Sequence, residues 1–255
     1  MISFIATQGL EACRLAASTW KLWPLDLHKP PVIEGTITGG LTNTAFLLST
    51  PHPNYPHLVL RLFSPQTKMY GINRCHEQTI HQLAAEQGIS PAILYWDNRL
   101  GFSVVEYLPG RTWSQADLES PDKRQALAQI IQRYQQLELT ELQPFNYYRH
   151  IKNYADRTCA LLSKAERLTL KAFLKNLEDW QGCAWPKTLT HHDLSPENII
   201  ETGSGLQIID WEYAGLGHPQ FDWLDLPEMD CGFSQCDRKQ LEQIRYWFIR
   251  LWQML

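Results

Sequence analysis

The chain has 255 residues, of which 44% are hydrophobic, and a formal net charge of −4 at pH 7. This length and composition can bury one large core, or the cores of two small lobes that pack together. The mildly acidic balance lacks the basic surplus of a nucleic-acid-binding protein, and no run of about 18 apolar residues predicts a membrane span.

The first 108 residues are predicted to be rich in strands. Residues 1–20 form a first helix rather than a signal peptide, because they lack a basic n-region and Glu11 interrupts them. Residues 32–50 have the pattern of a strand, a glycine turn and a second strand, and residues 58–63 form a strand that contains Arg61. A helix over residues 73–88 ends at Gly88. Two more short strands flank the DNRLG turn, and the segment EYLPG closes this region.

Beyond residue 108 the hydrophobic period becomes that of helices. Helices are predicted over residues 121–139, over residues 147–180 as two helices, and over residues 238–255. Between them, the segment LQIIDW predicts a strand that ends at Asp210. The pattern therefore predicts an α+β protein with a strand-rich N-terminal lobe, residues 1–108, and a helical C-terminal lobe, residues 109–255.

The cysteines bear on the compartment of the protein. None of the six forms a C-x-x-C pair, so neither a zinc knuckle nor a thioredoxin-like site is predicted. They are scattered through a chain too large to need disulfide staples, which predicts reduced, buried thiols in a cytoplasmic protein.

The segment LTHHDLSPENII, residues 189–200, concentrates the polar chemistry. Pro196 stands between Asp193 and Asn198 and predicts a loop rather than a helix. A loop followed by a short strand pair can bring Asp193, Asn198 and Asp210 to one point. A carboxylate and a carboxamide are hard oxygen ligands that suit Mg²⁺. The remaining carboxylate, Asp193, is then free to orient and deprotonate a hydroxyl, which is the division of labour in kinase chemistry.

Two motifs at this separation resemble the choline kinase / aminoglycoside phosphotransferase group. The motif H-x-D-x-x-x-x-N stands as His191, Asp193 and Asn198, and a second motif stands as IDWEYAGLGHPQFD over residues 209–222. The stretch SGLQIIDWEYAG also resembles bacterial thiamine kinases. The resemblance implies a bilobal protein-kinase-like fold and an ATP-dependent phosphotransferase that uses Mg²⁺ and a small-molecule alcohol as acceptor.

The resemblance also assigns nucleotide-binding residues in the first lobe. The segment GGLTN matches the family's nucleotide loop, Arg61 binds the phosphates, Glu77 holds Arg61 in an ion pair, and VVEYLPG resembles the hinge that meets adenine. The nucleotide-binding residues that it implies are Gly39, Gly40, Leu41, Thr42, Asn43, Arg61, Glu77, Glu106 and Tyr107.

For the acceptor, the resemblance implies a small cationic alcohol, with thiamine and choline as leading candidates and ethanolamine third. Glu212, Tyr213, Trp247 and Trp252 would supply charge and cation–π attraction. A surface position for Glu212 and Tyr213, and a core position for the two tryptophans, stay open. His191 and Asp222 are expected to be structural residues that brace the catalytic loop.

Departures and alternatives accompany this interpretation. His192 stands where many members of the group have Gly or Asn, Ser195 where choline kinases often have Gln, and Gly217 where their signature has Asn. A zinc hydrolase would use His191 and His192 with His218 as the third ligand. The absence of G-x-x-x-x-G-K-[ST] excludes a P-loop kinase. An aminoglycoside-type kinase and a non-catalytic pseudokinase-like nucleotide-binding module are the alternative functions.

Overall fold

The computed structural model describes residues 2–37, 43–139, 142–226 and 234–255, with side chains from residue 9 onward. The chain forms two compact units and crosses between them several times. The first unit comprises Met1–Thr67, Gln78–Ser114 and Ser195–Asp210, and the second comprises Lys68–Glu77, Gln115–Leu194 and Trp211–Leu255. Because the units interleave along the chain, the predicted lobe boundary after residue 108 stays a prediction.

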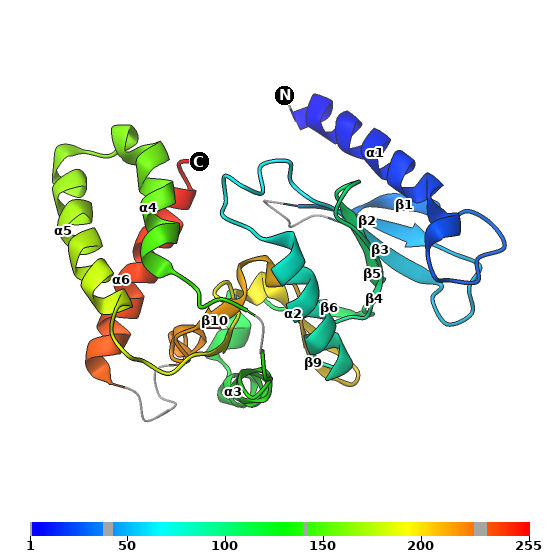
Figure 1. Cartoon of the computed structure of the whole chain (residues 1–255). Helices are drawn as coiled ribbons and strands as arrows, with labels where there is room; N and C mark the ends of the chain where they lie inside the picture. Colours follow the sequence, from blue (N-terminus) through cyan, green and yellow to red (C-terminus); the bar gives the residue numbers. More distant parts are fainter. Residues whose placement is uncertain (1, 38–42, 140–141, 227–233) are drawn as a thin grey trace. The chain divides into compact units, whose positions relative to one another are not determined.

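The order of elements confirms a strand-rich N-terminal portion and a helical C-terminal portion (Figure 1). The helices are α1 (Ile2–Ser18), α2 (Arg74–Glu86), α3 (Pro121–Gln135), α4 (Tyr147–Thr158), α5 (Lys164–Gln181) and α6 (Gln235–Trp252). The strands are β1 (Val32–Ile37), β2 (Thr44–Ser49), β3 (His57–Leu62), β4 (Ile93–Asp97), β5 (Phe102–Glu106), β6 (Gly110–Thr112), β7 (Thr188–Thr190), β8 (Ile199–Thr202), β9 (Gly205–Ile208) and β10 (Gly215–Gly217).

The first unit is built on an antiparallel sheet with the strand order β1-β2-β3-β5-β4. Alternate residues of β2 and β3, such as Phe46, Leu48 and Leu60, are buried on the same face. Helix α1 packs against that face through Cys13 and Ala16. Burying each large apolar side chain stabilises the unit by roughly 1.5–3 kcal/mol, which fixes the strand that carries Arg61.

A smaller sheet in the same unit has the order β6-β8-β9. Strands β8 and β9 form a hairpin that turns at Gly203 and Ser204, and Gly205, the first residue of β9, has a φ of 123°. That backbone conformation strongly favours glycine. The hairpin joins Asn198 of the first sequence motif to Asp210 of the second.

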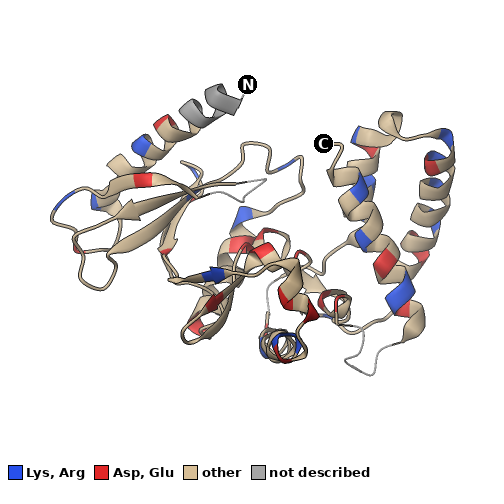
Figure 2. Cartoon of the chain, turned by 180° about the vertical axis from the view of Figure 1, so that it is seen from behind, with Lys and Arg blue, Asp and Glu red and all other residues tan. Residues whose placement is uncertain are grey.

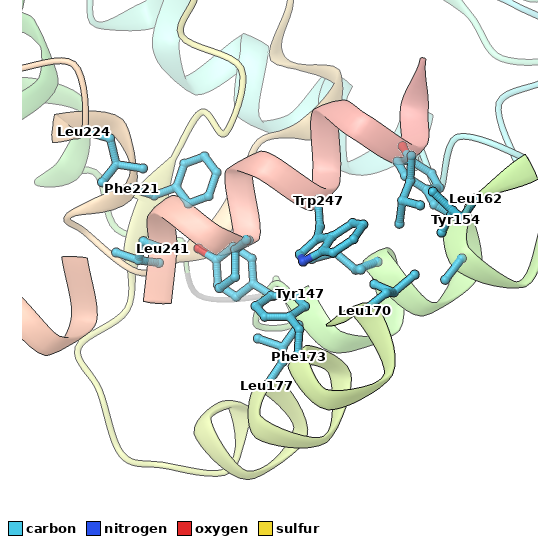
Figure 3. Close-up of a cluster of buried hydrophobic side chains, with 14 of the residues drawn as sticks. Tyr147, Tyr154, Leu162, Leu170, Phe173, Leu177, Phe221, Leu224, Leu241 and Trp247 are labelled. Carbon is cyan, nitrogen blue, oxygen red and sulfur yellow. The ribbon is translucent and has the colours of Figure 1, made fainter. Parts of the chain in front are cut away.

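The core of the second unit lies among helices α4, α5 and α6 (Figure 3). Tyr147 and Tyr154 of α4 meet Phe173 and Leu177 of α5 and Trp247 of α6 in one buried cluster. A capping box starts α5, in which Ser163 and Glu166 bond each other's backbone amides. The two predicted helices over residues 147–180 are thus confirmed as α4 and α5.

Basic and acidic residues both occur along the helices of the second unit (Figure 2). Arg238 and Glu242 form an i,i+4 pair on α6 at 3.0 Å, and Arg250 reaches Glu166 at 2.9 Å. This mixture of charges is expected of solvated helical faces. No helix in the described part of the chain is long and apolar enough to cross a membrane.

Two local predictions were wrong. The strand predicted to end at Asp210 ends at Ile208, because Asp210 has a φ of 64°, which is not an extended conformation. Of the cysteines predicted to be buried, Cys13 is buried, whereas Cys75, Cys159, Cys183 and Cys236 are exposed free thiols. Cys231 lies outside the described residues.

Candidate active site

One end of the β8–β9 hairpin carries two of the predicted metal ligands. Strand β8 begins directly after Asn198, and β9 ends two residues before Asp210. Ile199 pairs with Ile208, and the Ile209 amide donates a hydrogen bond to the Asn198 carbonyl at 3.0 Å. Antiparallel pairing therefore brings Asn198 and Asp210 to the same end of the hairpin.

Arg61 meets Asp210 at this end of the hairpin. Its Nη2 donates to the Asp210 Oδ1 at 2.6 Å, and the two side chains are only 11% and 22% exposed. Strand β3 holds Arg61 in register, opposite Ala45 of β2 and Ser103 of β5. The predicted Arg61–Glu77 pair would join residues of different units and stays a prediction.

The donor set at this end suits Mg²⁺. A carboxylate at Asp210 and a carboxamide at Asn198 offer hard oxygen ligands, which Mg²⁺ prefers over nitrogen or sulfur. The Asp210 carboxylate pairs with the guanidinium of Arg61, so the site places a negative group directly beside a positive one. The residues present therefore fit a magnesium ion that is also bound by the phosphate oxygens of a nucleotide.

The remaining predicted nucleotide residues belong to the same unit or lie outside the described residues. Gly39, Gly40, Leu41 and Thr42 lie outside them. Asn43 is buried and directly precedes β2. Glu106 ends β5, and its amide donates to the Ala92 carbonyl at 3.0 Å. Tyr107 follows it and is partly exposed, with its ring edge against His57.

The loop that follows β7 is braced by one buried carboxylate. Asp222 accepts the His191 amide at 2.7 Å and the His192 amide at 3.0 Å, one on each oxygen. The Tyr134 hydroxyl also donates to it at 2.6 Å. Burial raises the pKa of the Asp222 carboxyl, although these donors act in the opposite direction. The contacts agree with the bracing role predicted for Asp222.

Asp193 is exposed at the end of this braced loop. Its amide donates to the Nδ1 of His191 at 3.3 Å. His191 is fully buried and packs its ring against Trp211, with centroids 4.7 Å apart. The buried histidine thus supports the backbone of Asp193 and leaves the carboxylate accessible.

Arg74 joins two carboxylates that the sequence assigned to different tasks. Its Nη1 lies 2.5 Å from the Glu77 Oε2 and 3.1 Å from the Glu212 Oε2. The side chains of all three residues are at most 9% exposed. Glu77 is a predicted nucleotide residue and Glu212 a predicted acceptor residue, so Arg74 connects the two assignments inside the second unit.

The predicted aromatic acceptor residues occupy different environments. Tyr213 is buried, and its hydroxyl interacts with the side chains of Tyr154 and Trp252. The ring of Trp252 lies 6.4 Å from that of Tyr70. Trp247 is 3% exposed and packs in the core against Phe173 (Figure 3). Tyr213 and Trp252 thus belong to one group of interacting side chains, whereas Trp247 is part of the core.

Several supporting residues carried no recognisable sequence signal. Tyr134 is one of the apolar positions of α3, yet its hydroxyl holds Asp222. Tyr147 starts α4, and its hydroxyl lies 2.9 Å from the Nε2 of His192. Long-range hydroxyl contacts of this kind follow from tertiary packing and leave no local pattern.

Comparisons with known proteins show the family of the chain. Residues 35–249 match the family model described as "Phosphotransferase enzyme family" (APH). Protein LicA of Haemophilus influenzae is 27% identical over 203 residues, which cover 77% of this chain and 58% of that protein. The thiamine kinase of Escherichia coli O17:K52:H18 is 26% identical over 190 residues, which cover 71% and 61% respectively. The chain spans about three fifths of the length of these curated relatives.

Solved structures show the same fold. The choline kinase LicA from Streptococcus pneumoniae superposes with a TM-score of 0.69 at 23% identity, covering 87% of this chain and 85% of that chain. A structure of LicA in complex with AMP superposes with a TM-score of 0.58 at 24% identity, covering 85% and 73%. The predicted kinase-like fold class is confirmed.

Proposed function

The chain belongs to the phosphotransferase enzyme family, and from this premise we propose that it transfers the γ-phosphoryl group of ATP to the hydroxyl of a small-molecule alcohol. The observation that carries the proposal is the convergence of Arg61, Asp210 and Asn198 at one end of the β8–β9 hairpin. A phosphate-binding cation and two oxygen ligands at one point are the parts that phosphoryl transfer requires.

Each of these residues has a distinct task. Arg61 binds the phosphate oxygens, because a guanidinium offers paired donors to them. Asn198 and Asp210 hold Mg²⁺, which when bound supplies neutralisation of the charge on the transferred phosphoryl group. The binding of LicA to AMP in a structure of the same fold supports nucleotide binding by this chain.

Asp193 orients the acceptor hydroxyl and takes its proton. Its carboxylate is exposed, while Asp222 and His191 hold the backbone around it. A loose transition state demands little covalent chemistry of the protein, so accurate positioning supplies much of the rate. The contacts of Asp222 and His191 with the loop backbone would position Asp193 for this proton transfer.

We infer that the acceptor is a small cationic alcohol, with choline and thiamine as the leading candidates and ethanolamine third. Tyr213 and Trp252 interact with each other and offer aromatic rings that attract a cation. Glu212 precedes Tyr213 in sequence, and it shares the single guanidinium of Arg74 with Glu77. Because one cation faces two carboxylates, Glu212 and the aromatic rings would both attract a bound cation. The similarity to a choline kinase and to a thiamine kinase supports the same class.

The test is an acceptor panel with the purified protein and Mg·ATP. Choline, thiamine, ethanolamine and one aminoglycoside are compared by ADP release and by ³¹P NMR of the phosphate ester. Turnover on choline or thiamine, absent in Asp193→Ala, is expected. Turnover on the aminoglycoside alone would contradict the acceptor class. Nucleotide binding without turnover on a wide metabolite panel would favour the non-catalytic module instead.

A further inference from the structure

His192 holds an unusual backbone conformation beside Asp193. Its φ is +66°, in the left-handed region that residues other than glycine avoid. The His192 amide is held there by its hydrogen bond to the Asp222 carboxylate at 3.0 Å. The contacts of the His192 side chain help to stabilise this backbone conformation.

Both nitrogens of the His192 ring are used. Nδ1 lies 2.9 Å from the Tyr213 carbonyl, which can only accept a hydrogen bond, so Nδ1 carries the proton and donates. Nε2 then accepts from the Tyr147 hydroxyl at 2.9 Å. That hydroxyl in turn accepts the His218 amide at 2.9 Å. The ring therefore joins the loop to two other segments of the second unit with one defined tautomer.

Aromatic rings enclose the imidazole. Phe145 stacks on it with centroids 4.1 Å apart, and the edges of Tyr147 and Phe221 contact it at 5.3 and 5.1 Å. Burial lowers the pKa of His192 to about 3. Because the ring stays neutral, the donor and acceptor roles of its two nitrogens do not change at physiological pH.

Gly217 provides the space for this ring. A Cβ at residue 217 would lie 2.3 Å from the His192 Nε2, 2.7 Å from its Cε1, and 2.7 Å from the Tyr147 hydroxyl. Strand pairing of β10 with β7 places Gly217 opposite Thr188, so its backbone cannot easily move away. A side chain at 217 and the imidazole of His192 thus compete for the same volume.

We propose that His192 is a positioning residue, whose imidazole ties the loop carrying Asp193 to the segment carrying Glu212 and Tyr213, in a space that Gly217 leaves open. The catalytic consequence rests on the proposed function. The tie holds the loop through the His192 side chain, whereas Asp222 holds it through the backbone amides of His191 and His192. Losing it frees Asp193 to shift against the acceptor residues without touching the β8–β9 hairpin contacts that hold Arg61, Asn198 and Asp210.

The kinetic test compares His192→Gly with His192→Asn. Glycine accepts the left-handed backbone but removes the tie, and should lower kcat by about 10- to 100-fold while the Kd for Mg·ATP changes by less than about twofold. Asparagine can still donate to the Tyr213 carbonyl and should recover most of kcat. Wild-type kcat in His192→Gly, or no recovery in His192→Asn, would overturn the positioning role.

The structural test needs no activity. Gly217→Ala should strongly destabilise the wild type, but in the His192→Gly background its loss of stability should be at least about twofold smaller. Gly203→Ala is the control, because a Cβ there meets nothing within 4 Å, and its effect should be equal in both backgrounds. Equal effects of Gly217→Ala in both backgrounds would overturn the shared space.

The tautomer provides a third, direct observation. ¹⁵N NMR of the wild-type protein should show the His192 ring with its proton on Nδ1 and no cationic form at about pH 6. A proton on Nε2 would overturn the tie, whatever the acceptor panel shows. A wild-type protein that turns over no acceptor would refute the proposed function. The tautomer of His192 and its coupling to Gly217 would still show whether the imidazole ties the two segments together.

Discussion

Arg61 and Asp210, which are 149 positions apart in the chain, form an ion pair with 2.6 Å between Nη2 and Oδ1. One residue lies within strand β3 and the other follows strand β9. Both side chains are largely withdrawn from water, and a pair of this kind is costly to break from one side, by roughly 3–5 kcal/mol. The pair brings the proposed phosphate-binding cation and a proposed metal-binding carboxylate together.

Arg61→Met should weaken nucleotide binding by at least about tenfold, because the phosphates lose a charge-assisted donor. It should also destabilise the protein, because the Asp210 carboxylate keeps its burial and loses the guanidinium. Arg61→Lys retains a charge and should lose less of both. Nucleotide titration and thermal denaturation measure the two effects, and unchanged nucleotide affinity in Arg61→Met would exclude Arg61 from the phosphate site.

Asp210→Asn should make the protein dependent on much more Mg²⁺. Replacing the carboxylate by a carboxamide removes a negative ligand, so the Mg²⁺ concentration for half-maximal turnover should rise by about tenfold or more. Nucleotide binding measured with a chelator present should change far less. A Mg²⁺ titration that superposes on the wild-type curve would remove Asp210 from the metal site.

Buried histidines should make the protein sensitive to mild acid. Burial lowers the pKa of His81 and His150 to about 4, and that of His192 to about 3, from 6.5. The unfolded chain therefore binds protons that the folded chain does not. The stability that each ring contributes is present above pH 6.5 and is lost as the pH falls toward the folded-state pKa. The slope approaches about 1.4 kcal/mol per pH unit for each ring.

Urea denaturation between about pH 7 and pH 5 measures this slope. His150→Gln should reduce it by up to about 1.4 kcal/mol per pH unit. His28→Gln is the matched control, because its side chain is 81% exposed and the slope should stay as in the wild type. A wild-type stability that does not change over this range would contradict the neutral, buried rings.

Gly71 should not tolerate a side chain. Its φ is +70°, and a Cβ would lie 2.8 Å from His150, in a segment where the Tyr154 hydroxyl already holds the Tyr70 carbonyl at 2.8 Å. Gly71→Ala should cost about 2 kcal/mol or more of unfolding free energy. Gly35→Ala, where a Cβ meets nothing within 4 Å, should be neutral within about 0.5 kcal/mol. Equal stability of both variants in urea would contradict this packing.

Strong periodicity made the main elements predictable. The glycine-separated strands over residues 32–50 are β1 and β2, and the apolar faces over 147–180 are α4 and α5. Strands β6, β7 and β10 were not predicted, because each has three residues and exists only through pairing with a distant segment. Local patterns do not contain such pairings.

The candidate site was predictable where motifs named residue types at set spacings. Asn198 and Asp210 lie at the same end of the β8–β9 hairpin, since the hairpin between them is short. Trp247 could not be assigned from sequence, because the same helical spacing suits a core residue and a residue that lines a ligand site. In the structure it packs against Phe173 in the core. The departures at His192 and Gly217 looked independent in sequence, and only the structure shows that they share one space.

The role of Asp193 as the base is tested most directly by comparing wild type with Asp193→Asn on the best acceptor of the panel. In Asp193→Asn, kcat should fall by at least about 100-fold, because general-base catalysis of this kind contributes roughly 10²- to 10⁴-fold. The Kd for Mg·ATP should remain within about twofold of wild type, since Asp193 acts on the acceptor and not on the nucleotide. Near-wild-type turnover by Asp193→Asn would contradict the account.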